Sequence, residues 1–366
     1  MNNNYEIISE PIFNLPLERD TDDFIKFIEN KFNDFYDNIK KFDGELGEYV
    51  KKNSEIISGQ MNCIYSSINS YYEGKNSLAY SQLVNCLEKI CCHLWIQSKE
   101  VTEGRDKLYR VRLGEYRQYS KKDLFHIPFE KRNLVKRQRY SLPGLPCLYL
   151  STSIYTCWEE LNRPNIDKMH VSRFDLNIGK FKFLFLDQRP EIIRNMLKVP
   201  YENCSEATRI NIENFIVTFP LLLVCNIKVK DYESDFVPEY IFPQLLLQWV
   251  NNIDEIDGIQ YVSNKTQFSI SPITFLSETN IVIPPKKIKG EGYCEELTKR
   301  IKITNPISYQ LLEIKNPNEI KIKTSLFSLK RNFTTIELLK GEPTKYSLTK
   351  FGILEKKLND MNADYL

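Results

Sequence analysis

The chain has 366 residues, of which 42% are hydrophobic and 27% charged, the composition of an ordinary globular protein with room for more than one hydrophobic core. Fifty lysines and arginines against 48 aspartates and glutamates leave a formal net charge of +2, which excludes a global attraction to nucleic acid or to an anionic membrane. The N-terminus lacks the basic and apolar segments of a signal peptide, and no apolar run is long enough to span a bilayer. We therefore expect a cytoplasmic protein that binds neither nucleic acid nor a membrane.

The segment from about residue 20 to 99 has the pattern of a helical domain. Its apolar residues recur at intervals of three and four, beginning with Phe24 and Phe27. The side chains from Asp20 to Asp22 can cap the first long helix. We expect this all-helical N-terminal domain, residues 1–100, to contact regulatory proteins and to supply no catalytic group.

Nine cysteines are spread through the chain without regular spacing, and they are densest from Cys86 to Cys92, inside the helical pattern. This distribution favours reduced thiols in a cytosolic protein over a disulfide framework. Cys91, Cys92 and His93 have no second Cys or His pair at a ligand-like spacing. We therefore predict no metal site and no bound cofactor.

Beyond Thr102 the pattern changes to short apolar runs broken by Pro, Gly and Asn, which predicts strands. The runs are LYRVRL, PCLYLST, FKFLFLD, PLLLVCNIKV, GIQYVS and NIVIPP. The longest apolar stretch, roughly 215–229, is interpreted as a buried strand. Helices are expected between the strands at 154–161 and 240–250, and a final helix is expected near 354–361.

Strands interspersed with short helices predict an α+β catalytic body at residues 101–287. It lies between the helical domain and a C-terminal extension, residues 288–366. No internal repeat is visible. The predicted fold class is therefore α+β, with an all-helical domain preceding a body of mixed strands and short helices.

Three polar residues stand at equal spacing in the middle of the chain: Arg139, Tyr149 and Glu159. Tyr149 lies in a predicted strand. Ser151 or Ser153 can cap the following helix, which carries Glu159 in its second turn. The spacing places an arginine, a tyrosine and a carboxylate on consecutive elements.

Further residues complete this pattern: Tyr109 and Arg110 in LYRVR, Tyr140, Pro143 and Gly144 in the turn after Arg139, and Tyr261 to Ser263 in GIQYVS. In order, spacing and flanking residues the chain resembles the RES family, named for its Arg, Glu and Ser residues. Members of that family consume NAD⁺ and are similar in fold to ADP-ribosyltransferases. The resemblance covers roughly half of the chain, and residues 1–100 and 288–366 lie outside it.

The resemblance implies that NAD⁺ is bound by Tyr109, Arg110, Arg139, Tyr149 and Ser263, and that Glu159, Arg110 and Ser263 take part in catalysis. These residue types suit the chemistry. Guanidinium groups bind pyrophosphate in a bidentate manner. A carboxylate beside the ribose stabilises the oxocarbenium-like charge that develops as nicotinamide leaves. Because Glu160 follows directly, the carboxylate is one of the two glutamates, and we assign Glu159.

Each residue also has a purely structural interpretation. Arg139 could belong to the solvated charge run that begins at Lys131, and Tyr149 could be a core residue. His126 could contact a substrate phosphate, but a lone histidine is more often structural. Only the joint occurrence of the residues in family order favours a site.

We therefore predict an enzyme that cleaves the nicotinamide–ribosyl bond of its substrate NAD⁺, with water or inorganic phosphate as acceptor. The resemblance implies a bacterial toxin or defence effector, neutralised by an antitoxin that the N-terminal domain could bind. A protein ADP-ribosyltransferase would share the first half of the mechanism. A nucleotide-binding regulatory module without catalysis would share only the binding site. The sequence leaves the acceptor, the trigger and the formation of an oligomer open.

Overall fold

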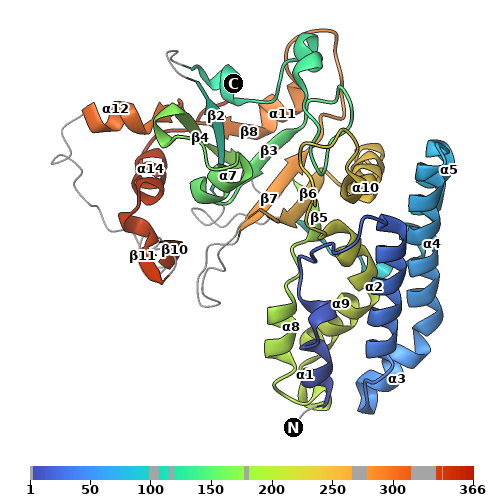
Figure 1. The fold of residues 1–366 in the computed structure, drawn as a ribbon. Coiled ribbons are helices and arrows are strands. Elements are labelled where there is room, and N and C mark those ends of the chain that lie inside the picture. The colour runs from blue at the N-terminus through green and yellow to red at the C-terminus, as the bar shows by residue number, and fades with distance from the viewer. Residues whose placement is uncertain are drawn as a thin grey trace. The chain divides into compact units, whose positions relative to one another are not determined.

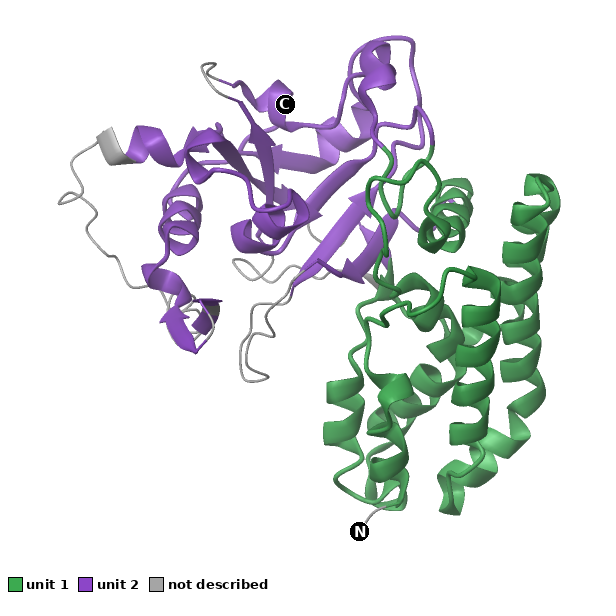
Figure 2. Ribbon diagram, viewed as in Figure 1, with its two compact units in different colours: residues 1–96, 137–142, 184–253 green, residues 97–136, 143–183, 254–366 purple. Residues whose placement is uncertain are grey.

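The computed structural model describes residues 3–98, 107–114, 119–176, 181–265, 278–314, 335–339 and 341–366. These residues form an α+β structure, which confirms the predicted fold class (Figure 1). The chain divides into two compact units (Figure 2). Unit 1 comprises residues 1–96, 137–142 and 184–253, and unit 2 comprises residues 97–136, 143–183 and 254–366.

Each unit is assembled from three separate segments, which differs from the three consecutive domains expected from the sequence. The chain passes from one unit to the other after Ile96, Lys136, Leu142, Phe183 and Ile253. The expected catalytic body, residues 101–287, is divided because three of its α-helices belong to the helical unit, namely α8 (Pro190–Met196), α9 (Glu206–Cys225) and α10 (Ile241–Asn252). Apolar periodicity shows which face of an element is buried, but not which distant segment covers it.

Unit 1 is mainly helical. Its helices are α1 (Asn3–Ile8), α2 (Phe24–Ile39), α3 (Gly44–Lys52), α4 (Ser54–Tyr72), α5 (Asn76–Lys89), α8 (Pro190–Met196), α9 (Glu206–Cys225) and α10 (Ile241–Asn252). The helical pattern predicted from Phe24 onward is confirmed, as is the helix expected at 240–250. The cap of α2 is Asp23, whose carboxylate accepts from a backbone N–H of the first turn at 3.0 Å. The predicted cap at Asp20 to Asp22 therefore lies too early in the chain.

The prediction of a buried strand at 215–229 is wrong, because most of this stretch is the second half of α9. Every residue from Phe215 to Cys225 is buried. A helix that is buried on all sides has no polar face, so its sequence lacks the 3.6-residue period that identifies an amphipathic helix. Phe219 stacks on Phe35 of α2, with ring centroids 4.8 Å apart. α9 is thus a core helix of unit 1.

α9 is long and apolar enough to cross a membrane by length and composition alone. However, 67% of its apolar window is buried inside the protein, as in a core helix of a soluble protein. No other helix among the described residues has this length and composition.

Gln60 is a polar side chain in the core of unit 1. It lies in α4 with an exposed fraction of 0%, and its amide has no hydrogen-bond partner within the described part of the chain. An unpaired buried amide costs about 1–3 kcal/mol. We expect Gln60→Met to raise the free energy of unfolding in urea by about this amount. Asn62→Met, at an exposed position of the same helix, is the control; an unchanged stability for Gln60→Met would contradict the prediction.

Unit 2 is built around a β-sheet. Its strands are β2 (Leu108–Leu113), β3 (Leu148–Ser151), β4 (Met169–Leu176), β6 (Gly258–Val262), β7 (Thr279–Ile283), β8 (Ile301–Ile303) and β9 (Ile307–Ser308). Among the described residues the strand order is β1-β5-β6-β7-β3-β2-β4-β8, with β9 paired to β4. β1 (Ile96–Ser98) and β5 (Lys182–Leu186) contain two of the points at which the chain passes between the units. β2, β3, β5, β6 and β7 confirm five of the predicted strands.

Apolar side chains of this sheet belong to two clusters. Leu108 and Tyr109 are neighbours on β2 but lie in different clusters, as the alternation of side chains along a strand requires. The Tyr109 cluster includes residues of α7 (Ile154–Glu160) and of α14 (Lys350–Asn359), which confirms both predicted helices. The remaining described elements of unit 2 include α6 (Lys121–Leu124), α11 (Glu295–Arg300), α12 (Tyr309–Ile314), β10 (Thr335–Leu339) and β11 (Glu342–Lys345).

Candidate active site

The ends of three strands in unit 2 bring polar residues together. Ser151 at the end of β3 lies opposite Asn280 on β7, and Asn280 lies opposite Tyr261 on β6. Directly after β3, the hydroxyl of Ser153 caps α7 by accepting a backbone N–H at 3.0 Å, so Ser153 is the one of the two predicted serines that caps this helix. Because α7 begins at the end of β3, its last residue, Glu160, reaches the same group of strand ends.

Glu160 is the carboxylate at the centre of this group. Its Oε1 atom accepts one hydrogen bond from Ser263 Oγ at 2.7 Å and another from Asn280 Nδ2 at 2.6 Å. Its Oε2 atom has no hydrogen bond to any described residue, and the side chain is partly exposed. One oxygen of the carboxylate is therefore fixed by two donors, whereas no described residue donates to the other.

Glu159, the glutamate assigned from the sequence, has a different environment. It is only 3% exposed, and both of its oxygens accept from Arg163, at 2.9 Å and 3.0 Å. Asn162 and Arg163 both have a positive φ, of 60° and 55°, which is uncommon outside glycine. The Glu159–Arg163 pair thus holds the unusual backbone at the end of α7, and the structure does not bring Glu159 into contact with Ser263.

Lys265 adds a second link at the end of α7. Its Nζ atom donates to the backbone carbonyl of Glu160 at 2.9 Å and to Asn162 Oδ1 at 3.0 Å. The segment after β6 is thereby tied to the helix end that carries Glu160. Beside it, Asn264 is 8% exposed, and neither polar atom of its amide has a hydrogen-bond partner in the described ranges. This amide is available to a bound molecule.

Arg110 and Tyr149 lie on the paired strands β2 and β3 of unit 2. Arg110 is partly buried, and its Nη1 atom is buried without a hydrogen-bond partner among the described residues. Burial lowers the pKa of this guanidinium to about 10, so it remains a cation at neutral pH. Burial also holds the pKa of the Tyr149 hydroxyl well above its usual value, and the two groups interact electrostatically. A desolvated cation with an open donor is suited to binding an anion.

Tyr109 is a core residue of unit 2. It is fully buried within the cluster that contains α7 and α14, and its hydroxyl donates to Asn359 Oδ1 at 3.0 Å. The Sγ atom of Cys157 donates to its backbone carbonyl at 3.4 Å. These contacts give Tyr109 a structural role beside Arg110.

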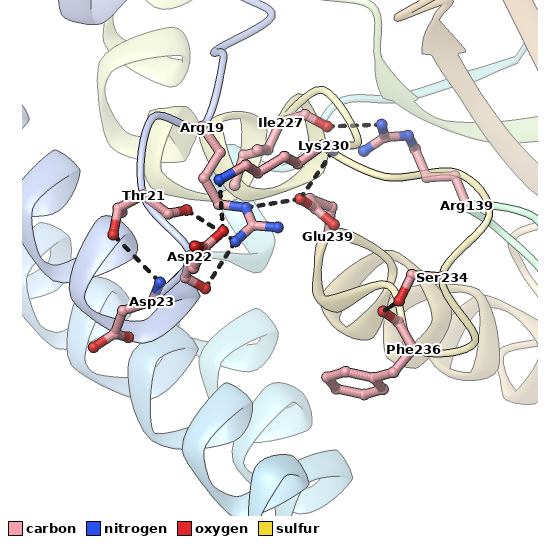
Figure 3. A network of polar contacts seen from close by, with 10 residues as sticks. All are labelled: Arg19, Thr21, Asp22, Asp23, Arg139, Ile227, Lys230, Ser234, Phe236 and Glu239. Atoms are coloured by element: carbon pink, nitrogen blue, oxygen red, sulfur yellow. Dashed lines mark hydrogen bonds and ion pairs between the residues drawn. The ribbon is translucent and has the colours of Figure 1, made fainter.

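Arg139 belongs to unit 1, whereas Glu160, Ser263 and Asn280 belong to unit 2. Its Nη1 and Nη2 atoms donate to the backbone carbonyls of Cys225 at 3.2 Å and Ile227 at 2.7 Å. Its guanidinium also lies 5.5 Å from the centroid of the Tyr240 ring. Figure 3 shows Arg139 and also the buried ion pair of Arg19 and Glu239, in which Glu239 accepts from the backbone N–H of Lys230 as well. Arg139 thus anchors the segment that follows α9.

His126 is buried, and both ring nitrogens have partners. Its Nδ1 atom lies 2.8 Å from the carbonyl of Ile127, and its Nε2 atom accepts from the backbone N–H of Cys294 at 2.9 Å. Burial lowers the pKa of this histidine to about 4, so it is neutral at physiological pH. His126 is a structural residue that links two loops.

The sequence predicted Arg110, Tyr149 and Ser263 as site residues, and the structure places all three in unit 2. It did not identify Asn280, because an asparagine near the start of an apolar strand belongs to no recognisable motif. Asn264 and Lys265 directly follow the Tyr-x-Ser strand. Their position next to Ser263 was the signal that could have identified them.

No model of a known protein family matches the chain. A protein of Bacillus subtilis (strain 168) described as "Putative toxin YopC" is 30% identical over 323 residues, which span 86% of this chain and 73% of that protein. Among solved structures, a chain in the crystal structure of the M. tuberculosis MbcT-MbcA toxin-antitoxin complex aligns with 61% of this chain and with 90% of its own length, at 12% identity and a TM-score of 0.28. The identity to YopC extends over most of both proteins. The chain therefore belongs to the family of YopC.

Proposed function

We propose that the chain is a cytoplasmic toxin that cleaves the nicotinamide–ribosyl bond of NAD⁺, the activity that its resemblance to the RES family implies. The description of the relative YopC supports a toxin. One observation supports the enzyme: the Glu160 carboxylate is held by two donors on one oxygen, while its other oxygen is open. Glu159 differs, because both of its oxygens accept hydrogen bonds from Arg163.

In this proposal the catalytic carboxylate is Glu160 in place of Glu159. The carboxylate of Glu159 is occupied by Arg163, whereas Glu160 contacts Ser263, the serine that the resemblance assigns to the site. The Ser263 hydroxyl donates a hydrogen bond to Glu160 and so orients the carboxylate. Tyr149 and Arg110 complete the group of proposed substrate-binding residues in unit 2, together with the open amide of Asn264.

The reaction breaks the bond between the ribose C1′ and the nicotinamide nitrogen. The electron pair of that bond returns to the pyridinium ring, which leaves as neutral nicotinamide. Positive charge then develops on the ribose, and the open Oε2 atom of Glu160 stabilises it electrostatically. An oxygen of water or of inorganic phosphate forms the new bond at C1′, and its proton is released to solvent. The products are ADP-ribose or ADP-ribose phosphate.

The Arg110 guanidinium has the chemistry to hold the pyrophosphate of the substrate. It is desolvated, and its buried Nη1 atom has no acceptor among the described residues. A phosphate oxygen would supply the missing acceptor, and charge-assisted hydrogen bonds of this kind are among the stronger ones in proteins. A toxin with this activity also requires a neutralising antitoxin in the cell that makes it, and such a partner is part of the proposal.

Product analysis tests the proposal directly. Purified protein is incubated with NAD⁺, with and without inorganic phosphate, and the products are separated by chromatography and identified by mass. We expect free nicotinamide in both reactions, and the second product identifies the acceptor. Bound but intact NAD⁺ would support the binding module in place of the enzyme. ADP-ribose attached to protein would support the transferase, and neither binding nor nicotinamide release would end the proposal.

A further inference from the structure

The open carboxylate of Glu160 is the last member of a chain of buried hydrogen bonds. Ser151 Oγ donates to Asn280 Oδ1 at 2.5 Å, and Asn280 Nδ2 donates to Glu160 Oε1 at 2.6 Å. Ser263 reaches the same Oε1 atom from the other side. Ser151, Asn280 and Ser263 are each at most 6% exposed. These three side chains are therefore largely shielded from water, while Glu160 itself is partly exposed.

The contacts determine how the Asn280 amide is oriented. An ionised carboxylate only accepts hydrogen bonds, so the NH₂ group of Asn280 must face Glu160. The amide oxygen then faces Ser151, whose hydroxyl can donate to it. Glu160 sets this orientation, because the hydroxyl of Ser151 can either donate to the amide oxygen or accept from the amide nitrogen.

The backbone holds this chain in place. Asn280 lies opposite Ser151 on one side and opposite Tyr261 on the other, in the middle of three hydrogen-bonded strands. Backbone pairing continues beyond the ends of β3 and β6. Thr152 N donates to Thr279 O at 3.0 Å, and Ser263 N donates to Glu278 O at 2.7 Å. Groups mounted on a sheet are positioned more tightly than groups on a loop.

We infer that Asn280 is a positioning residue for the catalytic carboxylate, and that Ser151 supports it as the hydrogen-bond partner of its amide oxygen. The inference rests on the proposed function, because it assigns Asn280 a purpose in that site. Asn280 donates to the Oε1 atom of Glu160, and in the proposed function the substrate is contacted by the Oε2 atom. Its loss lets the carboxylate rotate, so the effect falls on kcat and leaves KM nearly unchanged.

The Asn280→Asp substitution tests this through pH. The new carboxyl has the shape of the amide but cannot donate while it is ionised, and two ionised carboxylates repel each other. At high pH we expect kcat to fall by about 10- to 100-fold relative to the natural protein, since small displacements of a catalytic group have effects of this size. At lower pH the two carboxyls share one proton, which restores the donor, and the kcat ratio should recover.

Asn305→Asp is the matched control, because it makes the same chemical change at an exposed position of unit 2, between β8 and β9. Its kcat ratio should stay near one at every pH. Asn280→Ala should lower kcat at all pH values without the recovery, and Ser151→Ala should cause a smaller loss. A kcat ratio for Asn280→Asp that does not change with pH would overturn the inference.

Crystal structures of the natural protein and of Asn280→Ala give a readout that does not depend on activity. We expect the Glu160 carboxylate to occupy a single position in the natural protein and to be displaced or divided among rotamers in the variant. An unmoved carboxylate in Asn280→Ala would also overturn the inference. If the natural protein releases no nicotinamide, the proposed function fails, while these two structures still decide the positioning role.

Discussion

The Glu160→Gln variant is expected to lose about 10²- to 10³-fold in kcat for nicotinamide release while it retains most of its affinity for NAD⁺. The carboxylate acts on positive charge that develops only as the bond breaks, so its loss falls on the transition state. The amide of glutamine keeps an oxygen that can accept from Ser263 and Asn280. The local packing should therefore survive, and only the negative charge is lost. Steady-state kinetics together with calorimetric titration of NAD⁺ separate the two effects.

Glu159→Gln is the internal comparison, because the two residues are neighbours with different partners. Glutamine at 159 keeps one acceptor for Arg163 but loses the bidentate ion pair. We expect a lower melting temperature and a smaller loss of kcat than in Glu160→Gln. A fully inactive Glu159→Gln beside a nearly normal Glu160→Gln would return the catalytic role to Glu159. Equal losses in both variants would count against our assignment.

The Arg110→Met variant is expected to weaken NAD⁺ binding by about 10- to 100-fold, the worth of a hydrogen bond to a charged group. The same variant should be as stable as the natural protein or more stable. Arg110 is desolvated and has no anionic partner among the described residues, so an apolar side chain of similar size removes a cost to folding. A variant with lower NAD⁺ affinity but unchanged or higher stability identifies an arginine that binds the ligand. An arginine that supports the fold would lose stability on substitution.

Arg112→Met is the control for this experiment. Arg112 lies on the same strand but is exposed, and it donates to the backbone carbonyl of Asp123 at 2.8 Å. Its substitution should leave the affinity for NAD⁺ unchanged. Binding by calorimetry and thermal melts in the absence of nucleotide provide both measurements. Unchanged NAD⁺ affinity in Arg110→Met, or a large loss of stability, would show that Arg110 does not bind the substrate.

Elements with a clear period were predictable from the sequence. The helical spacing that begins with Phe24 and Phe27 predicts α2, and the alternating run that begins at Leu108 predicts β2. The stretch from Phe215 to Cys225 was not predictable, because burial on all sides removes the period. In such a stretch, composition alone does not separate a helix from a strand.

The site was predictable as a set of residue types but not in its detail. The spacing from Tyr149 identifies the pair Glu159 and Glu160. The positive φ values of Asn162 and Arg163 accompany the ion pair of Arg163 with Glu159, which leaves the Glu160 carboxylate without a cationic partner among the described residues. Arg163 holds Glu159 from only four residues away, but the residues that hold Glu160, Ser263 and Asn280, are more than 100 residues distant in the chain. Arg139 stands close to Tyr149 in sequence, but residues 137–142 belong to unit 1, and no local pattern reveals this.

The chain crosses from one unit to the other five times, and this order of segments determines when each unit can be completed during translation. α4 and α5 leave the ribosome well before α9 and α10, which belong to the same unit, so unit 1 cannot be completed until Ile253 has emerged. Asn280, whose amide donates to Glu160, leaves the ribosome after Ile253. A nascent chain, or a fragment from a premature stop before this residue, therefore lacks a finished site. Under the proposed function, the cell that translates this gene is exposed to the activity only after most of the polypeptide has been made.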